Sequence, residues 1–196
     1  MIRQDKKRFR PVDMAYMAFF AVVIAICSWL SVPAAVPFTM QTFGVFAALG
    51  LLGGKRGTFA VLLYLLLGAV GIPVFAGFSG GAGVLFGATG GYLIGFLFAG
   101  LVYWMITAKL GSRNGNHNGK SHCDGIWVMV CAMVAGLVVC YGFGTVWFLW
   151  NYTNHSGPVG LATVLGWCVL PFLLPDALKI ALAVLVTRQL KPHVKL

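Results

Sequence analysis

Residues 160–187 read GLATVLGWCVLPFLLPDALKIALAVLVT, an uninterrupted apolar run that holds one acid, Asp176, and one base, Lys179. A helix that crosses a bilayer needs about 20 consecutive apolar residues, so this run is long enough to span a membrane. It is also longer than one straight crossing requires. Because proline disrupts the interior of a helix, we expect a break in this last helix near Pro171 and Pro175.

The rest of the chain repeats the apolar pattern. Sixty per cent of the 196 residues are hydrophobic and only 9% are charged, which leaves too little polar surface for a water-soluble domain of this size. The sequence predicts an all-α membrane protein of about six transmembrane helices, forming a single integral membrane domain over residues 1–196. The other five apolar runs are Val12–Ser31, Val36–Leu52, Thr58–Ile72, Val84–Ala108 and Ile126–Trp150.

The basic residues predict the orientation. Thirteen of the fourteen Lys and Arg residues lie before the first apolar run or after the second, fourth and sixth, and the other connectors contain none. Since cytoplasmic loops carry the excess of Lys and Arg, we expect both termini in the cytoplasm of a cell whose cytoplasmic membrane holds the protein. Residues 1–11 would form a basic cytoplasmic tail and residues 109–125 a flexible cytoplasmic loop. Despite a net charge of +10, this dispersed pattern is not that of a nucleic-acid-binding face.

Two alternative interpretations of local segments are weaker. A basic start followed by an apolar stretch is also typical of a cleaved signal peptide, but the stretch Met14–Leu30 is too long for one. The segment His117–Asp124 gathers potential metal ligands, yet its Gly, Asn and Ser content favours a linker. We therefore expect no metal and no cofactor. The cysteines within apolar runs have no metal-ligand spacing and are interpreted as packing residues; these are Cys27, Cys131, Cys140 and Cys168.

A glycine-rich segment at residues 77–92 resembles neither a P-loop nor a dinucleotide-binding loop in its spacing. It does begin a row of small residues at four-residue intervals: Gly83, Gly87, Gly91, Gly95 and Ala99. Such a row lets a second helix approach closely. Glycines before a helix also leave backbone N–H groups free for a ligand. The sequence leaves both interpretations open.

Asp176 and Lys179 are the most informative residues, because ionisable groups inside a membrane are costly and usually functional. Spaced i, i+3, they share a helix face. With Pro175 at the first helical position, Asp176 would lie in the first turn, where the helix dipole favours an acid. A salt bridge that merely neutralises two charges is the structural alternative. The functional interpretation is a site for a neutral polar group such as a cyclic urea, which needs both acceptors and donors.

Four motifs in order resemble the BioY family, the substrate-binding S components of biotin energy-coupling-factor transporters. They are VPFTMQTFG at Val36–Gly44, LLYLLLGAVGIPVFAG at Leu62–Gly77, GATGGYLIGF at Gly87–Phe96, and PDALK at Pro175–Lys179. The family often has Gly-Pro-Thr where this chain has Gly87-Ala88-Thr89. The similarity is good over residues 36–98 and 170–185.

The resemblance implies a six-helix protein that captures biotin from the external side. ATP would be hydrolysed by separate ATP-binding subunits, joined to this chain through a transmembrane coupling subunit. A small-residue A-x-x-x-A pattern on the first helix, Ala21 and Ala25, would meet that coupling subunit. The implied ligand-binding residues are Asp176, Lys179, Tyr92, Gly80, Gly81, Gly83, Thr89, Gly90 and Gly91. Asp176 is assigned to the ureido N–H groups, and Lys179 to either the ureido carbonyl or the valerate carboxylate.

Three other function classes compete with this interpretation. A proton-coupled carrier of a related small vitamin or carboxylate would use Asp176 as its proton site. A structural or assembly protein would keep the glycines for packing and bind no small molecule. An enzyme is not expected, because the apolar runs contain no catalytic constellation.

Overall fold

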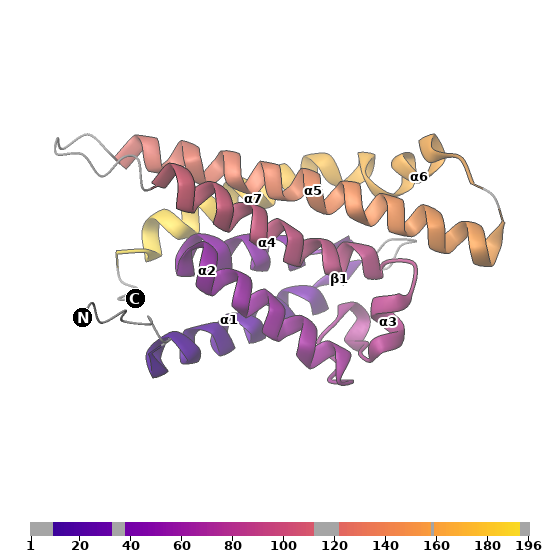
Figure 1. The fold of residues 1–196 in the computed structure, drawn as a ribbon, viewed down its shortest axis with the longest axis horizontal. Coiled ribbons are helices and arrows are strands. Elements are labelled where there is room, and N and C mark those ends of the chain that lie inside the picture. The colour runs from indigo at the N-terminus through magenta and orange to yellow at the C-terminus, as the bar shows by residue number, and fades with distance from the viewer. Residues whose placement is uncertain (1–9, 33–37, 112–121, 158, 193–196) are drawn as a thin grey trace, which may run out of the picture.

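The computed structural model describes residues 10–32, 38–111, 122–157 and 159–192, and its long helices run alongside one another in a bundle (Figure 1). Five stretches are long and apolar enough to cross a membrane: Pro11–Trp29, Gln41–Ala69, Gly90–Leu110, Gly125–His155 and Leu161–Leu190. The helices are α1 (Pro11–Trp29), α2 (Gln41–Ala69), α3 (Ala82–Phe86), α4 (Gly90–Gly111), α5 (His122–Ser156), α6 (Leu161–Cys168) and α7 (Leu170–Leu190). A 3-10 turn, η1, covers Ala76–Phe78, and strands β1 (Ser31–Val32) and β2 (Phe38–Thr39) pair antiparallel.

The chain turns back on itself within α2, at Gly53. This glycine has φ 78° and ψ 166°. The positive φ lies outside the helical region, and glycine adopts it more readily than other residues because it has no Cβ atom. A Cβ atom on Gly57 would lie only 2.7 Å from the Cα of Leu49, whereas residues eight apart in a straight helix are about 12 Å apart. The element therefore consists of two helical segments, 41–52 and 54–69, that pack against each other. They correspond to the second and third apolar runs of the sequence.

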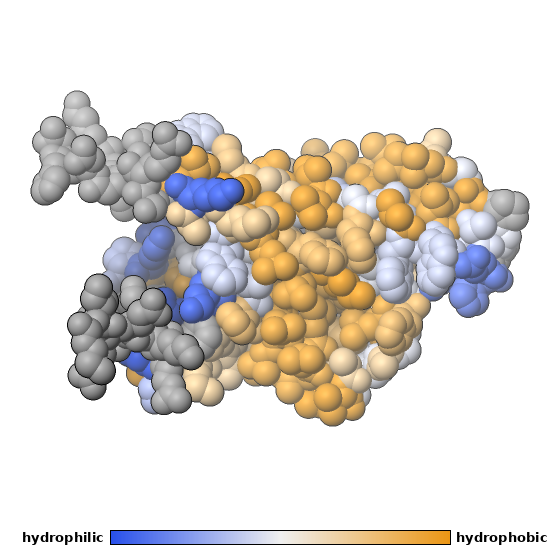
Figure 2. Space-filling model, viewed as in Figure 1, coloured by the Kyte–Doolittle hydropathy of each residue, from blue (hydrophilic) through white to orange (hydrophobic). Residues whose placement is uncertain are grey.

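Helix α7 has its polar and apolar faces reversed relative to a helix of a soluble protein. Its buried face carries Asp176, Lys179, Ala183 and Thr187, whereas its exposed face carries Leu174, Leu178, Leu182 and Leu185. On the face shown in Figure 2, a broad apolar band covers the middle of the molecule, and hydrophilic residues gather toward its two ends. Exposed leucines on this scale are stable only where lipid replaces water. The chain is a multi-pass membrane protein.

The two segments of α2 lie at the centre of the bundle, where α1, α4 and α7 pack against them. Helix α5 packs mainly on α4, and small residues bring these two helices together. A Cβ atom on Gly91 would lie 2.3 Å from Cβ of Trp147, and one on Gly95 would lie 2.9 Å from Sγ of Cys140. For this part of the small-residue row, helix packing is the role that the structure shows. Gly83 and Gly87 lie outside α4, in α3 and at its C-terminal end, so the row is not continuous on one helix.

The break before α7 lies at Val169, whose φ −122° and ψ −56° separate α6 from α7. Pro171 occupies the first turn of α7, where proline costs no hydrogen bond, and Pro175 lies within the helix. The prediction that Asp176 lies in the first turn is therefore wrong. The acid lies further along α7, where burial and its partners, rather than the end of the helix dipole, decide its environment.

Two predicted cytoplasmic segments are only partly described. Residues 109–111 end α4 and residues 122–125 begin α5, so both edges of the predicted 109–125 loop are helical. Residues 112–121 and 1–9 lie outside the described residues, and so do His117–Ser121 of the potential metal-binding segment. Among the described residues, no group of three or more His, Cys, Asp or Glu side chains is placed to hold a metal ion.

Candidate ligand-binding site

A cavity of about 200 Å³ lies between the start of α2, the segment that connects α2 to α4, and helices α4 to α7. Most of its wall is apolar, and its polar groups come from distant parts of the sequence. The lining residues are Thr39, Gln41, Thr42, Phe75, Ala76, Ser79, Val84, Thr89, Tyr92, Leu93, Phe96, Leu137, Cys140, Tyr141, Cys168, Phe172, Asp176 and Lys179. An apolar cavity with a few convergent polar groups is the usual form of a small-molecule site.

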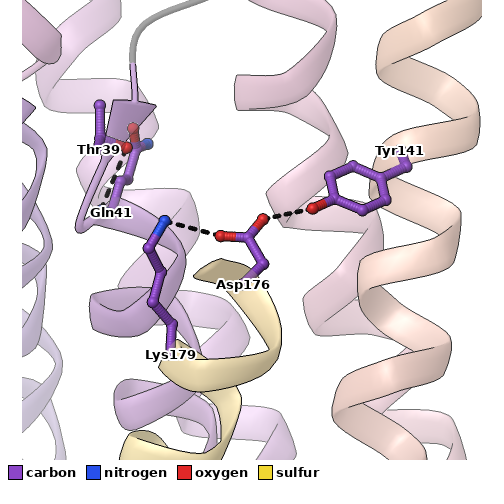
Figure 3. Close-up of polar contacts among 5 residues, drawn as sticks. All are labelled: Thr39, Gln41, Tyr141, Asp176 and Lys179. Carbon is purple, nitrogen blue, oxygen red and sulfur yellow. Dashed lines mark hydrogen bonds and ion pairs between the residues drawn. The ribbon is translucent and has the colours of Figure 1, made fainter. Parts of the chain in front are cut away.

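Asp176 and Lys179 form the charged part of this cavity (Figure 3). The two residues are 3% and 5% exposed, and Lys179 Nζ lies 2.7 Å from Asp176 Oδ1. The Tyr141 hydroxyl of α5 donates to Asp176 Oδ2 at 2.5 Å. Each carboxylate oxygen thus has one protein donor and retains a lone pair for a ligand, since a carboxylate accepts about four hydrogen bonds. The contacts hold the carboxylate in one orientation.

Aromatic side chains form the walls beside the charged pair. The Phe38 ring lies beneath Lys179, with Nζ 4.2 Å from the ring centroid, and stacks against Phe172 at 5.8 Å between centroids. The cation is thus held by both a carboxylate and an aromatic face. On α4, the Tyr92 hydroxyl pairs with Thr145 Oγ1 at 3.2 Å. These rigid apolar surfaces suit a flat ring system that enters beside the charged pair.

The residues predicted to bind ligand divide into two groups. Asp176, Lys179, Tyr92 and Thr89 line the cavity, whereas Gly80, Gly81, Gly83, Gly90 and Gly91 are not among its lining residues. Gly80 and Gly90 instead let the backbone pass close to carbonyl oxygens, because a Cβ atom would lie 2.5 Å from Ile72 O and 1.8 Å from Leu85 O, respectively. These two glycines shape the segment that bounds the cavity.

Ala21 and Ala25, predicted to contact a coupling subunit, are 1% and 3% exposed. Their side chains pack into the core that α1 forms with α2. The exposed face of α1 carries other residues, among them Val22 and Ile26.

Several lining residues were missed from the sequence. Tyr141 gave no signal, because it is one of two tyrosines on a 35-residue helix and nothing in the local sequence distinguishes it. Thr39, Gln41 and Thr42 belong to the motif at Val36–Gly44, so that motif was the available signal for them. Cys140 and Cys168 were interpreted as packing residues only, yet both line the cavity. Cys27 packs in the core as expected, and Cys131 is exposed.

This combination of lipid-facing helices and a largely apolar cavity with a buried charged pair defines a membrane protein that binds a small molecule. The BioY family model matches residues 4–196, and the chain belongs to the BioY family. It is 39% identical over 173 residues to the biotin transporter BioY of Thermotoga maritima, covering 88% of this chain and 91% of that protein. It is 37% identical over 180 residues to the probable biotin transporter BioY of Pyrococcus horikoshii, covering 91% of this chain and 96% of that protein.

A solved structure resembles the fold over nearly its whole length. The structure is the crystal structure of the S component for biotin from an ECF-type ABC transporter. The TM-score is 0.75 at 29% sequence identity, and the match covers 92% of this chain and 90% of that chain. The family resemblance expected from four sequence motifs is therefore confirmed.

Proposed function

We propose that this chain binds biotin and mediates its uptake, as the S component of an energy-coupling-factor transporter. The observation that carries the proposal is the buried Asp176–Lys179 pair, held by Tyr141 in the wall of an otherwise largely apolar cavity. Relatives named as biotin transporters, and a solved biotin S component of the same fold, support this ligand. Transport rather than catalysis is the activity that this family membership supports.

The chemistry of the cavity matches the two fused rings of biotin. Asp176 accepts hydrogen bonds from the ureido N–H groups, and the fused sulfur ring packs against apolar and aromatic walls such as Phe172. The pair carries no net charge, so it does not require a charged ligand head group. A neutral urea can thus replace water at the pair without leaving an unpaired charge.

We propose six crossings with both termini in the cytoplasm, counting the two segments of α2 separately. The start of α1, the end of α7 and the ends of α4 and α5 that flank residues 112–121 all lie at one end of the molecule (Figure 1). The segment with α3 lies toward the other end. Since the basic connectors favour the cytoplasm, the cavity receives its ligand from the external side.

The proposed partners are a transmembrane coupling subunit and separate ATP-binding subunits, as the solved S component's description as part of an ABC transporter suggests. We propose that α1 faces the coupling subunit. Because Ala21 and Ala25 are buried, the contact would use the exposed side of the same helix, near Ala18 and Val22. Lipid covers the remaining apolar surface.

A proton-coupled carrier is the alternative, and the comparisons do not favour it. A carrier needs an acid that gains and loses a proton during transport, whereas Asp176 is held in an ion pair with a lysine one turn away. Uptake that follows the proton gradient in cells lacking any ATP-binding subunits would support the carrier instead.

The decisive experiment is titration calorimetry of biotin into the detergent-purified protein and into Asp176→Asn and Lys179→Met variants. We expect one-site binding by the unmodified protein and at least a 100-fold loss in either variant, because each leaves an unmatched buried group. Lys191→Met is the matched control, since it removes an exposed lysine at the end of α7 and should bind normally. Folded protein that binds no biotin would overturn the proposed function.

A further inference from the structure

Gln41 carries a buried amide nitrogen that nothing in the described part of the chain satisfies. The residue is 3% exposed, lines the cavity and begins α2. Its backbone N–H donates to Thr39 Oγ1 at 3.3 Å, but its side-chain Nε2 has no partner of good hydrogen-bond geometry among the described residues. Leaving a buried N–H group unpaired is unfavourable, so such a donor in a cavity wall indicates a group that a ligand pairs.

The position of Gln41 relative to the charged pair indicates which part of a ligand it meets. In Figure 3, Gln41 lies on the Lys179 side of Asp176, and Tyr141 lies on the opposite side. The same local segment contacts Lys179, because the ring of Phe38 lies 4.2 Å from Nζ. The polar wall therefore runs from an acceptor, Asp176, to two donors, Lys179 and Gln41.

We propose that the Gln41 amide donates a hydrogen bond to the carbonyl oxygen of the cyclic urea, beside Lys179, while Asp176 accepts its N–H groups. This inference rests on the proposed function and names a specificity-determining residue within it. A urea presents N–H donors next to a carbonyl acceptor, which is the complement of this wall. The arrangement assigns Lys179 to the urea end of the ligand.

The alternative is a structural role for the Gln41 amide. The Tyr64 hydroxyl is also buried without a partner of good geometry in the described residues, and the Gln41 and Ser28 side chains lie near enough to form weak hydrogen bonds with it. A Gln41 that only supported Tyr64 would affect every ligand equally. The chemistry of the ligand's carbonyl position therefore separates the two roles.

The test is a double-mutant cycle between the protein and the ligand. Biotin and its thione analogue, in which sulfur replaces the ureido oxygen, are titrated into the unmodified protein and into Gln41→Met, a change that keeps side-chain length and removes the donor. Sulfur is a weak acceptor. We expect Gln41→Met to weaken biotin binding about tenfold and thione binding by less than threefold. An equal loss for both ligands, or no loss for biotin, would overturn the assignment of Gln41.

A second variant keeps the test informative if Gln41→Met is unstable. Gln41→Glu places a carboxylate acceptor at the same point. The guanidino analogue of biotin carries a donor in place of the oxygen, so the ratio of its affinity to that of biotin should rise at least tenfold in this variant. An unchanged ratio of the two affinities would refute the contact. The unmodified protein is measured first: absence of biotin binding there would reject the proposed function, whereas normal binding with unchanged ratios would reject only the role of Gln41.

Discussion

Helix α7 and the glycine-rich segment at residues 77–91 were both predicted to bind the ligand, but they contribute to the cavity in different ways. Helix α7 places Phe172, Asp176 and Lys179 directly in the cavity wall. The segment supplies few lining side chains, and its glycines mainly allow close backbone approaches. The difference teaches that an ionisable pair inside an apolar run has few roles other than function, whereas glycine serves turns, packing and binding alike.

The largest expected effect is on the stability of the α7 pair. Removing one partner of a buried ion pair leaves the other without compensation, so Asp176→Asn and Lys179→Met should each lower the free energy of unfolding by about 3 kcal/mol. We expect the double variant to recover more than half of that loss. The measurement is thermal unfolding in detergent without ligand. Single variants as stable as the unmodified protein would show that water reaches both groups.

The glycine-rich segment and the start of α4 should respond according to packing, not ligand chemistry. Gly91→Ala places a Cβ atom 2.3 Å from Cβ of Trp147, and the required shift of α4 from α5 should cost about 2 kcal/mol in the free energy of unfolding. Gly83→Ala is the matched control, because no atom lies within 4 Å of its added Cβ. It should leave stability and biotin affinity unchanged. If Gly83→Ala abolished biotin binding in a stable protein, the backbone of this segment would contact the ligand after all.

The smallest effect concerns the residue that holds Asp176 from α5. Tyr141→Phe removes the donor to Oδ2 and should weaken biotin binding by about 1.5 kcal/mol, or tenfold, because a hydrogen bond to a charged group is lost. Titration calorimetry measures this change. Tyr152→Phe, on the same helix, is the control, because its ring stacks on Phe148 and lies outside the cavity lining. Equal affinities for Tyr141→Phe and the unmodified protein would mean that Lys179 alone orients the carboxylate.

The sequence predicted the apolar runs well because each run reports its own length and composition. The second and third runs appear as the two segments of α2, and the short linker between them contains the turn at Gly53. A break in the last run was predicted near Pro171 and Pro175, and the structure has one at Val169, two residues before Pro171, while the helix continues through Pro175. Proline restricts where a helix can begin, yet it does not forbid a continuous helix through Pro175 when only one early hydrogen bond is lost.

The site was predicted only where a residue was unusual in its own segment. Asp176 and Lys179 are charged in an apolar run, and that contrast is visible without a fold. Tyr141 and Gln41 are ordinary residues of their helices, and their importance arises from neighbours distant in the sequence. Tyr141 lies 35 residues from Asp176, and no local pattern reports their hydrogen bond.

By itself, the sequence determined that lipid must cover this chain and that one acid and one base lie together inside it, because composition and i, i+3 spacing are local properties. The tertiary structure decided which side chains complete the site. Only the packing of α2, α5 and α7 brings the Gln41 amide and the Tyr141 hydroxyl to opposite sides of Asp176 (Figure 3). Burial, which makes the pair and the unpaired amide energetically significant, is a property of the assembled bundle rather than of any one helix.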